Sequence, residues 1–479
     1  MAKGFGIHGS TTDHGGVVIS TQSRSSQMGN LFLRAGDGFA CPKCKCWSTL
    51  IKSNDHVIFD GKAVAYVGDK FTCGATLLPK QMHVVGDSGG GAISPINFTN
   101  SLGNNNNSFV DEPTNSQIRL RSVMSDKFVP LGVASFDGKP SKSDLVFVFA
   151  ITKGSFDKIV LEVEYNGDYI EVKKIEKALD EGMVGEFKWD GFVKDTYNSH
   201  FMTNPKGIKF RIRGYLSGIE KASHEKSFVF EYSDKNWMDV IINKRTQTII
   251  INLRVNFVDG GASGLFNGNG VSPAAITANK VKPYNTQTKS FNDLLKLAQE
   301  GINYYWSRNN THPTGKNIGI NGVQYEVFVK TQNTKTMAMP EMKLTFITNN
   351  NPDDPLFRSS NWFLSRKTAY VTGYVKLGNN WRFYSYLYSD KKFKETIAHE
   401  TGHAIVEAYA GFSESVTHHG SSHYSQNPKS GTTYPKTGEI DLMKYADETL
   451  SQVPGWDTRQ VANSKDVTAL ICLSGIAKK

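Results

Sequence analysis

The sequence predicts a multidomain protein of mixed class, in which a small β unit, a β-sandwich and an α+β domain follow one another along 479 residues. Three observations lead to this prediction. Cysteine-bearing strand–turn units repeat near the N-terminus, alternating apolar runs fill the middle, and a helical pattern with two histidines follows further strands. The predicted domains are 1–95, 115–256 and 257–479, and residues 96–114 form a predicted flexible linker.

The composition is typical of a globular protein, since 39% of the residues are hydrophobic and 21% are charged. The formal net charge of +10 is not gathered into Lys/Arg blocks, and no nucleic-acid motif accompanies it, so nucleic acid is not an expected partner. We find no apolar run long enough for a membrane span or a secretory signal. We therefore expect synthesis in the cytoplasm and export by a route that needs no cleaved signal peptide.

The N-terminal segment repeats itself. Residues 29–41 and 61–73 share the frame G-x6-G-D-x-F-x-C without gaps. Each copy is predicted to be a short apolar strand that enters a Gly-Asp turn and ends on a cysteine. Repeated strand–turn units are expected to stack on each other or around an axis.

The cysteines of this segment predict a metal site. Cys41 and Cys44 have the C-x-x-C spacing that a tetrahedral zinc ion accepts, and Cys73 of the second copy is a third ligand. Either His14 or His56 completes the set. Because cysteines in a reducing compartment rarely form disulfides, we expect a structural zinc ion here.

Several motifs occur in the order found in the PAAR-repeat domain, which this segment resembles: His14-Gly-Gly-Val-Val, the two Gly-Asp turns, Cys41-Pro-x-Cys and Cys73-Gly-Ala-Thr-Leu. The resemblance covers roughly the first 90 residues. It implies a pointed, zinc-bound β cone that caps the type VI secretion spike. It also implies that the base of the cone docks on the trimeric valine-glycine-repeat spike protein, with cargo fused behind the cone.

The middle of the chain alternates between apolar and polar residues in several short runs. Turn signals such as Asn166-Gly167 separate them. Strands at this spacing predict a β-sandwich of immunoglobulin-like type. Since none of these runs carries a catalytic pattern, we expect a spacer or adhesion module. The runs are 145–150, 159–165, 207–213, 228–232 and 248–255.

The last domain carries the pattern that predicts chemistry. A helix is predicted over 292–301, ending on its glycine, and strands over 323–329, 343–348, 368–372 and 381–388. The next predicted helix has Ser389 or Asp390 as its N-cap, ends at Gly411 and contains the H-E-x-x-H pattern of His399, Glu400 and His403. This spacing places both imidazoles on one helix face, where they can bind one zinc ion while Glu400 points at the metal-bound water.

A helix, a sheet and then a metal-binding helix is the order found in zincin metallopeptidases, and residues 291–448 resemble one. The resemblance implies hydrolysis of peptide bonds, with His399 and His403 as ligands of a catalytic zinc ion and Glu400 as general base. Met443 resembles the methionine that forms a floor under the metal in several zincin families.

A catalytic zinc site needs a third protein ligand. We predict Glu439, because burial of the apolar residues that follow it would hold this segment beneath the metal helix, and His418 is the alternative. Asp441 is a candidate second partner for a ligand histidine. The candidate donors to the oxyanion are Tyr445, His418 and His423.

Together the resemblances imply a type VI secretion effector, a PAAR-tipped zinc metallopeptidase toxin that acts on protein in the periplasm of a rival cell. A cognate immunity protein is then an expected partner. Two alternatives remain open. The domain is a zinc amidase or endopeptidase that cuts peptidoglycan peptides, or it is not an enzyme and the spike tip uses it for adhesion.

Overall fold

The computed structural model divides the chain into two compact units, Met1–Val110 and Asp111–Lys479, called here the N-terminal and C-terminal units. Among the residues described, no helix is both long enough and apolar enough to cross a membrane. The structure describes residues 2–22, 26–27, 30–52, 57–59, 62–80, 85–87, 116–123, 127–265, 270–350, 359–362, 365–417, 419, 428, 430–446 and 453–479.

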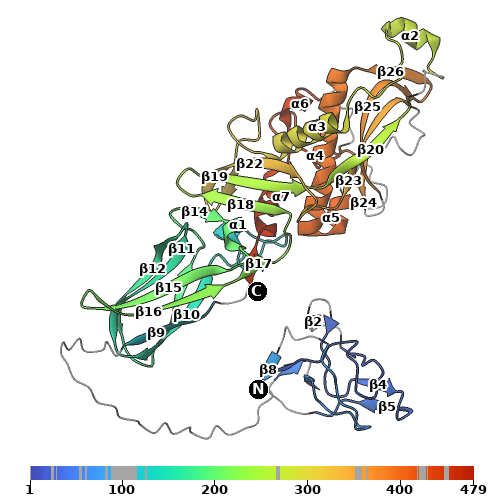
Figure 1. Cartoon of the computed structure of the whole chain (residues 1–479). Helices are drawn as coiled ribbons and strands as arrows, with labels where there is room; N and C mark the ends of the chain where they lie inside the picture. Colours follow the sequence, from blue (N-terminus) through green and yellow to red (C-terminus); the bar gives the residue numbers. More distant parts are fainter. Residues whose placement is uncertain are drawn as a thin grey trace, which may run out of the picture. The chain divides into compact units, whose positions relative to one another are not determined.

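The N-terminal unit consists of short strands and isolated bridges around a small apolar centre (Figure 1). Phe39 and Phe71, which hold the same place in the two repeat copies, are fully buried and meet edge to face with ring centroids 4.8 Å apart. Its strands are β1 (Ala2–Gly4), β2 (Ser26–Gln27), β3 (Asn30–Leu31), β4 (Gly38–Cys41), β5 (Cys46–Thr49), β6 (Ile58–Phe59), β7 (Lys62–Ala63) and β8 (Val85–Asp87).

The two predicted repeat copies have the same backbone geometry. In each, the aspartate after the turn glycine accepts a hydrogen bond from the backbone N–H three residues earlier. Arg34 N donates to Asp37 Oδ2 and Tyr66 N donates to Asp69 Oδ2, both at 2.8 Å. The predicted repeat is thus confirmed, because the shared residues make the same contacts.

Two antiparallel sheets face each other in the first part of the C-terminal unit. Phe147 and Trp189 of one sheet pack on Phe210 of the other, with ring centroids 4.6 and 5.6 Å from it. The predicted strands 145–150, 159–165 and 207–213 are confirmed here. One sheet has the order β13 (Val184–Trp189), β10 (Leu145–Lys153), β9 (Gln117–Val123), and the other β12 (Asp168–Leu179), β11 (Phe156–Tyr165), β15 (Ile208–Leu216), β16 (Ile219–Phe228).

The other two predicted runs are strands, but they lie outside these sheets. Residues 228–232 give β17 (Phe230–Tyr232), which pairs with β29 (Ile476–Lys478). Residues 248–255 form β19, which runs parallel to a strand that follows the predicted boundary at residue 256. Every second residue of β19 is buried, and such alternation does not reveal which sheet a strand joins. This sheet has the order β14 (Thr196–Asn198), β18 (Met238–Asn243), β19 (Thr248–Val255), β22 (Val323–Asn333), β21 (Ile318–Ile320).

A second mixed sheet and the longer helices complete the C-terminal unit. The sheet has the order β20 (Phe257–Ser263), β23 (Met342–Asn350), β25 (Ser365–Leu377), β24 (Ser360–Trp362), with β26 (Asn380–Tyr384) also on β25. β27 (Ile440–Asp441) pairs with β28 (Gln460–Val461). The helices are η1 (Pro130–Gly132), α1 (Ser199–Met202), α2 (Pro273–Asn279), α3 (Phe291–Trp306), α4 (Tyr386–Ala410), α5 (Phe412–Val416), α6 (Trp456–Arg459) and α7 (Ser464–Leu473).

Helix α3 extends beyond its predicted end. A capping box between Ser290 and Asp293 starts the helix, and it passes through Gly301 to Trp306. A Cβ atom on Gly301 would lie 2.4 Å from the backbone oxygen of Lys394 in α4. This glycine therefore permits the two helices to approach closely and does not end the first one.

Helix α4 begins earlier than predicted. Its N-cap is Ser385, whose hydroxyl accepts a hydrogen bond from Tyr388 N at 3.4 Å. The predicted strand 381–388 accordingly ends at Tyr384, and Ser389 is a buried residue of the first turns and not a cap. The C-terminal end at Gly411 is as predicted.

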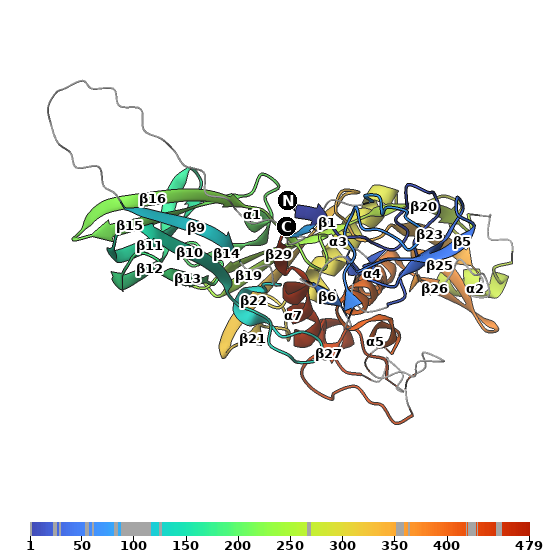
Figure 2. The same ribbon diagram turned by 90° about the horizontal axis from the view of Figure 1, so that it is seen from below.

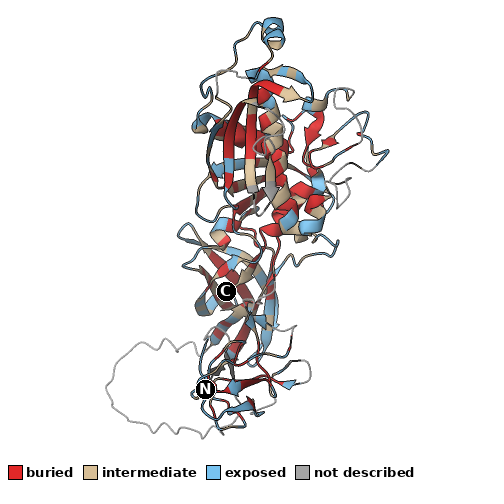
Figure 3. Ribbon diagram, turned by 90° about the vertical axis from the view of Figure 1, so that its right-hand side faces the viewer, coloured by how far each residue is buried: buried red, intermediate tan, exposed pale blue. Residues whose placement is uncertain are grey.

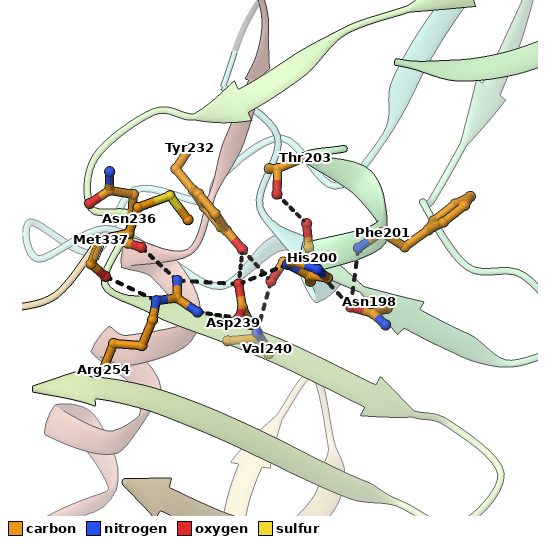
Figure 4. A network of polar contacts seen from close by, with 11 residues as sticks. Asn198, His200, Phe201, Thr203, Tyr232, Asn236, Asp239, Val240, Arg254 and Met337 are labelled. Carbon is orange, nitrogen blue, oxygen red and sulfur yellow. Dashed lines mark hydrogen bonds and ion pairs between the residues drawn. The ribbon is translucent and has the colours of Figure 1, made fainter. Parts of the chain in front are cut away.

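One apolar core runs through the C-terminal unit, from the facing sheets to α3, α4 and α7 (Figure 3). A network of hydrogen bonds and ion pairs connects residues of β17, β18 and β19 (Figure 4). Asp239 of β18 accepts hydrogen bonds from Tyr232 Oη (2.5 Å) and from Arg254. The same guanidinium donates to the carbonyl oxygens of Asn236 and Met337. Buried charges of this kind need such complete partners, and the network fixes β17, β18 and β19 to one another.

Candidate metal centres

Helix α4 presents the two histidines of the H-E-x-x-H pattern side by side. Its apolar residues Phe393, Ile397 and Ile405 are buried, and Trp306 of α3 donates its indole N–H to Ala398 O at 3.0 Å. These contacts fix the rotation of the helix about its axis. The imidazole rings of His399 and His403 are then 4.9 Å apart and perpendicular.

The Nδ1 atom of each imidazole is hydrogen-bonded to a backbone carbonyl oxygen. His399 Nδ1 lies 2.8 Å from Leu442 O, and His403 Nδ1 lies 3.0 Å from Ser415 O. Since a carbonyl oxygen only accepts, each Nδ1 carries the proton, and each Nε2 keeps a lone pair. This tautomer is the one that metal-binding histidines adopt.

Glu400 is buried in α4, and Tyr445 lies against His399. Glu400 is 8% exposed, and burial raises its pKa to about 8. The Tyr445 ring stacks on His399 at 5.4 Å, and its hydroxyl is 3.4 Å from His399 Nε2. A phenol that can donate a proton thus lies next to His399 Nε2, and the charge of Glu400 is felt by that phenol.

Met443 packs against α4 from below. A Cβ atom on Gly402 would lie 2.3 Å from Met443 Sδ and 3.0 Å from Trp306 Cζ2. Met443 and Leu442 are both buried, so this segment is fixed to the helix by packing as well as by the bond to His399. Met443 therefore lies under the helix, as the sequence predicts.

The predicted third ligand lies elsewhere in this structure. Glu439 forms an ion pair with Arg308 at 2.5 Å. No described His, Cys, Asp or Glu forms a three-residue group with His399 and His403 in which all ligand atoms lie within 4.8 Å of one another. For Glu439 to act as a zinc ligand, its carboxylate must leave Arg308.

Three further residues were predicted to take part in the α4 site: His418, His423 and Asp441. His418 and His423 lie outside the described residues. Asp441 was predicted as partner of a ligand histidine, but its carboxylate accepts hydrogen bonds from His419 and Asn463. The Nδ1 atoms of the two α4 histidines lie against the carbonyl oxygens of Leu442 and Ser415 instead.

The N-terminal unit gathers four predicted ligands. His14 Nδ1 lies 3.7 Å from Cys41 Sγ, 3.6 Å from Cys44 Sγ and 4.0 Å from Cys73 Sγ. A tetrahedron with ordinary zinc–nitrogen and zinc–sulfur bonds has a nitrogen–sulfur edge of about 3.6 Å. The four residues therefore fit a structural zinc ion. His56 lies outside the described residues.

The thiols of this cluster differ in their pKa. Hydrogen bonding with Cys41 raises the pKa of Cys44 to about 11, whereas a hydrogen bond with Ser48 lowers the pKa of Cys73 to about 6. Neighbouring thiolates repel one another, so the cluster cannot carry three negative charges by itself at neutral pH. A zinc ion binds thiolates and balances their charge.

Residues 8–79 match the family model of the PAAR motif. The match supports a spike-tip protein of the type VI secretion system. It lies within the N-terminal unit and includes all four residues of the cysteine–histidine cluster. No curated protein matches the chain.

The N-terminal unit, called the PAAR unit below, contains a third copy of the repeat, which the two-copy frame did not predict. Gly9 and Ser10 stand at the positions of the Gly-Asp turn, and His14 stands at the position of the cysteine. Ile7 N donates to Ser10 Oγ at 3.3 Å, in place of the bond to aspartate seen in the other copies. The signal was present in the spacing from Gly9 to His14, but serine and histidine had replaced the residues that define the frame.

The three copies close into a ring. Gly6 N donates to Ala65 O at 2.8 Å, Ala65 N to Leu33 O at 2.9 Å, and Leu33 N to Gly6 O at 2.9 Å. These residues hold the same place in each copy, three before the turn glycine. His14, Cys41 and Cys73 likewise hold one place. The ring therefore brings one ligand from each copy to a common point, where Cys44 joins them.

Proposed function

We propose that the chain is a type VI secretion effector whose PAAR unit delivers a zinc metallopeptidase carried in the C-terminal unit. Its substrate is protein in the periplasm of a rival cell, and an immunity protein protects the producing cell. The observation that carries this proposal is the arrangement on α4, where two histidines 4.9 Å apart both bond a carbonyl oxygen through Nδ1 and the Glu400 of the same pattern is buried. The PAAR match supports the delivery step.

His399 and His403 would hold the ion through Nε2, since the Nδ1 atom of each lies against a backbone carbonyl oxygen. When bound there, zinc supplies a Lewis acid that polarises a peptide carbonyl and lowers the pKa of bound water to about 7. The charge of a bound ion would lower the pKa of Glu400 again, and its carboxylate could then take a proton from the attacking water and return it to the leaving amine.

Tyr445 is the proposed donor to the developing oxyanion. Its hydroxyl lies 3.4 Å from His399 Nε2, and its ring is held flat against that imidazole. A donor fixed before the reaction stabilises the charge without having to reorganise. His418 is retained as an alternative donor.

The test is the Glu400→Gln variant of residues 115–479 expressed in a bacterial periplasm. We expect the unaltered sequence to arrest growth and the variant to lose hydrolysis by at least about a hundredfold, because a general base contributes about 10²–10⁴-fold. The variant should keep its zinc and its cooperative unfolding, since Glu400 is not a ligand in this proposal.

Three outcomes of this experiment are informative. Unchanged toxicity of Glu400→Gln would contradict an enzymatic role and favour adhesion. Loss of zinc from the variant would mean that Glu400 is a ligand. Release of muropeptides by the unaltered protein would replace protein by peptidoglycan peptide as the substrate.

A further inference from the structure

A second group of metal-ligating side chains lies in the C-terminal unit, apart from the α4 histidines. It consists of His419 after α5, Asp441 in β27 and Asp466 in the first turn of α7. The three elements α5, β27 and α7 are labelled in Figure 2. One ligand atom from each lies within 4.8 Å of the other two. The three residues come from separate elements, so the fold and not local sequence brings them together.

Asp441 fixes the orientation of the imidazole. Its Oδ2 accepts hydrogen bonds from His419 Nδ1 at 2.8 Å and from Asn463 Nδ2 at 2.9 Å, and its Oδ1 accepts one from Met443 N at 2.9 Å. The carboxylate therefore has donors on both oxygens. His419 Nδ1 carries the proton, and its Nε2 lone pair points away from Asp441 toward Asp466.

Among the residues that the structure describes, Asp466, in contrast to Asp441, does not have donors on both carboxylate oxygens. It is 6% exposed, and within the described part of the chain its Oδ2 has no hydrogen-bond partner. Its Oδ1 lies 3.7 Å from His419 Nε2, which is too far for a hydrogen bond. Its Oδ1 has His419 as an ion-pair partner only when that imidazole is protonated, and its buried Oδ2 has no donor among the described residues, which is costly for a carboxylate.

The gap between His419 and Asp466 has the size that a metal ion requires. An ion about 2.1 Å from both Nε2 and Oδ1 would span 3.7 Å with an angle of about 120° between the two bonds. The group borders a cavity of about 330 Å³, which Glu414 and Lys465 also line. The cavity leaves room for water molecules to complete the coordination.

We propose that His419 Nε2 and the carboxylate of Asp466 bind a divalent transition-metal ion, with Asp441 as the carboxylate that orients the histidine. An imidazole nitrogen together with a carboxylate suits zinc and its neighbours. The ion joins the segment that leaves α5 to the start of α7. Because Ser415 of α5 accepts the hydrogen bond from His403, this cross-link also holds in place an element that orients the α4 site.

The test measures zinc bound by the full chain in the His399→Ala/His403→Ala background, where the α4 site cannot contribute. After chelation, each protein is dialysed against micromolar zinc chloride, and its zinc content and zinc-induced rise in Tm are measured. We expect Asp466→Asn and His419→Gln each to bind one zinc ion fewer than the parent and to lose the corresponding rise in Tm. Asp441→Asn should bind this ion about 10–100-fold more weakly.

Lys465→Gln is the matched control, because it lines the same cavity without offering a ligand, and it should bind as the parent does. Without zinc, Asp466→Asn should melt no lower than the parent, since the substitution removes a buried charge. If Asp466→Asn fails to fold, His419→Gln provides a second variant. Equal zinc content and equal zinc-induced Tm shifts in the parent, Asp466→Asn and His419→Gln would overturn the proposal. That result would leave the proposed peptidase untouched, because the α4 histidines are absent from every protein compared.

Discussion

At the residue scale, Gly402 is the member of the H-E-x-x-H segment whose identity is required by packing and not by a role in metal binding or catalysis. Its missing side chain leaves the space that Met443 and Trp306 fill. We expect Gly402→Ala to lower the free energy of unfolding by about 1–3 kcal/mol, as overpacking of a filled core does. Urea denaturation of the C-terminal unit measures this effect.

A double variant separates this clash from a loss of helix geometry. Shortening Met443 to alanine removes the atom closest to the new methyl group, so Gly402→Ala/Met443→Ala should lose less stability than the two single changes added together. Simple additivity would show that the two residues do not compete for this space.

The third zinc ligand is also a question of single residues. If Glu439 is the ligand, Glu439→Gln should lose the exchangeable zinc ion, whereas His418→Ala should keep the ion and lose rate. Zinc content after dialysis against a weak chelator distinguishes them, and the reverse pattern would assign the ligand to His418. Because the ion pair with Arg308 must break first, Arg308→Gln is expected to strengthen zinc binding at this site.

The sequence predicts these residues unequally, for a physical reason. His399 and His403 are four positions apart in one helix, so local geometry alone places them on one face. Glu439 instead pairs with Arg308, 131 residues away, and no local pattern carries that information. The role of His14 follows from its register in a repeat copy that has lost the aspartate and cysteine of the frame.

At the element scale, the contact between α3 and α4 depends on Gly301. A Cβ atom there would meet the backbone of Lys394, which cannot move aside as a side chain can. We expect Gly301→Ala to force the helices apart and to cost about 1–3 kcal/mol or more in stability. Lys296→Ala, at an exposed position of the same helix, is the control and should change stability by less than about 0.5 kcal/mol.

The spacing of apolar residues predicted most elements but not their neighbours. The strand runs were confirmed because a period of two is a local property. Their assignment to sheets was not, since β17 pairs with the end of the chain and β19 pairs with β22. Gly301 was interpreted as a helix end because glycine is common there, whereas a close helix contact uses the same residue for a different reason.

At the scale of the whole molecule, the chain consists of two units, one candidate zinc site lies in the N-terminal unit, and two candidate metal sites lie in the C-terminal unit. We expect Cys41→Ser to remove the zinc ion of the PAAR unit and to destabilise that unit alone. Elemental analysis should find one ion fewer, and calorimetry should find the transition of the C-terminal unit unchanged. A parallel fall in hydrolysis would contradict this independence.

The backbone ring of the PAAR unit determines when, during synthesis of the chain, that unit can complete its folding. Gly6 of the first copy bonds directly to Ala65 of the last, so each copy has two neighbours and no copy is terminal. A linear array of repeats can lose a unit from its end and keep the remainder folded. Here the first two copies can bond to each other through Leu33 and Gly6, but two of the three bonds of the ring need Ala65 of the last copy. The ring therefore closes only after residues 61–73 have been synthesised, and a chain interrupted before that point has two copies with open ends.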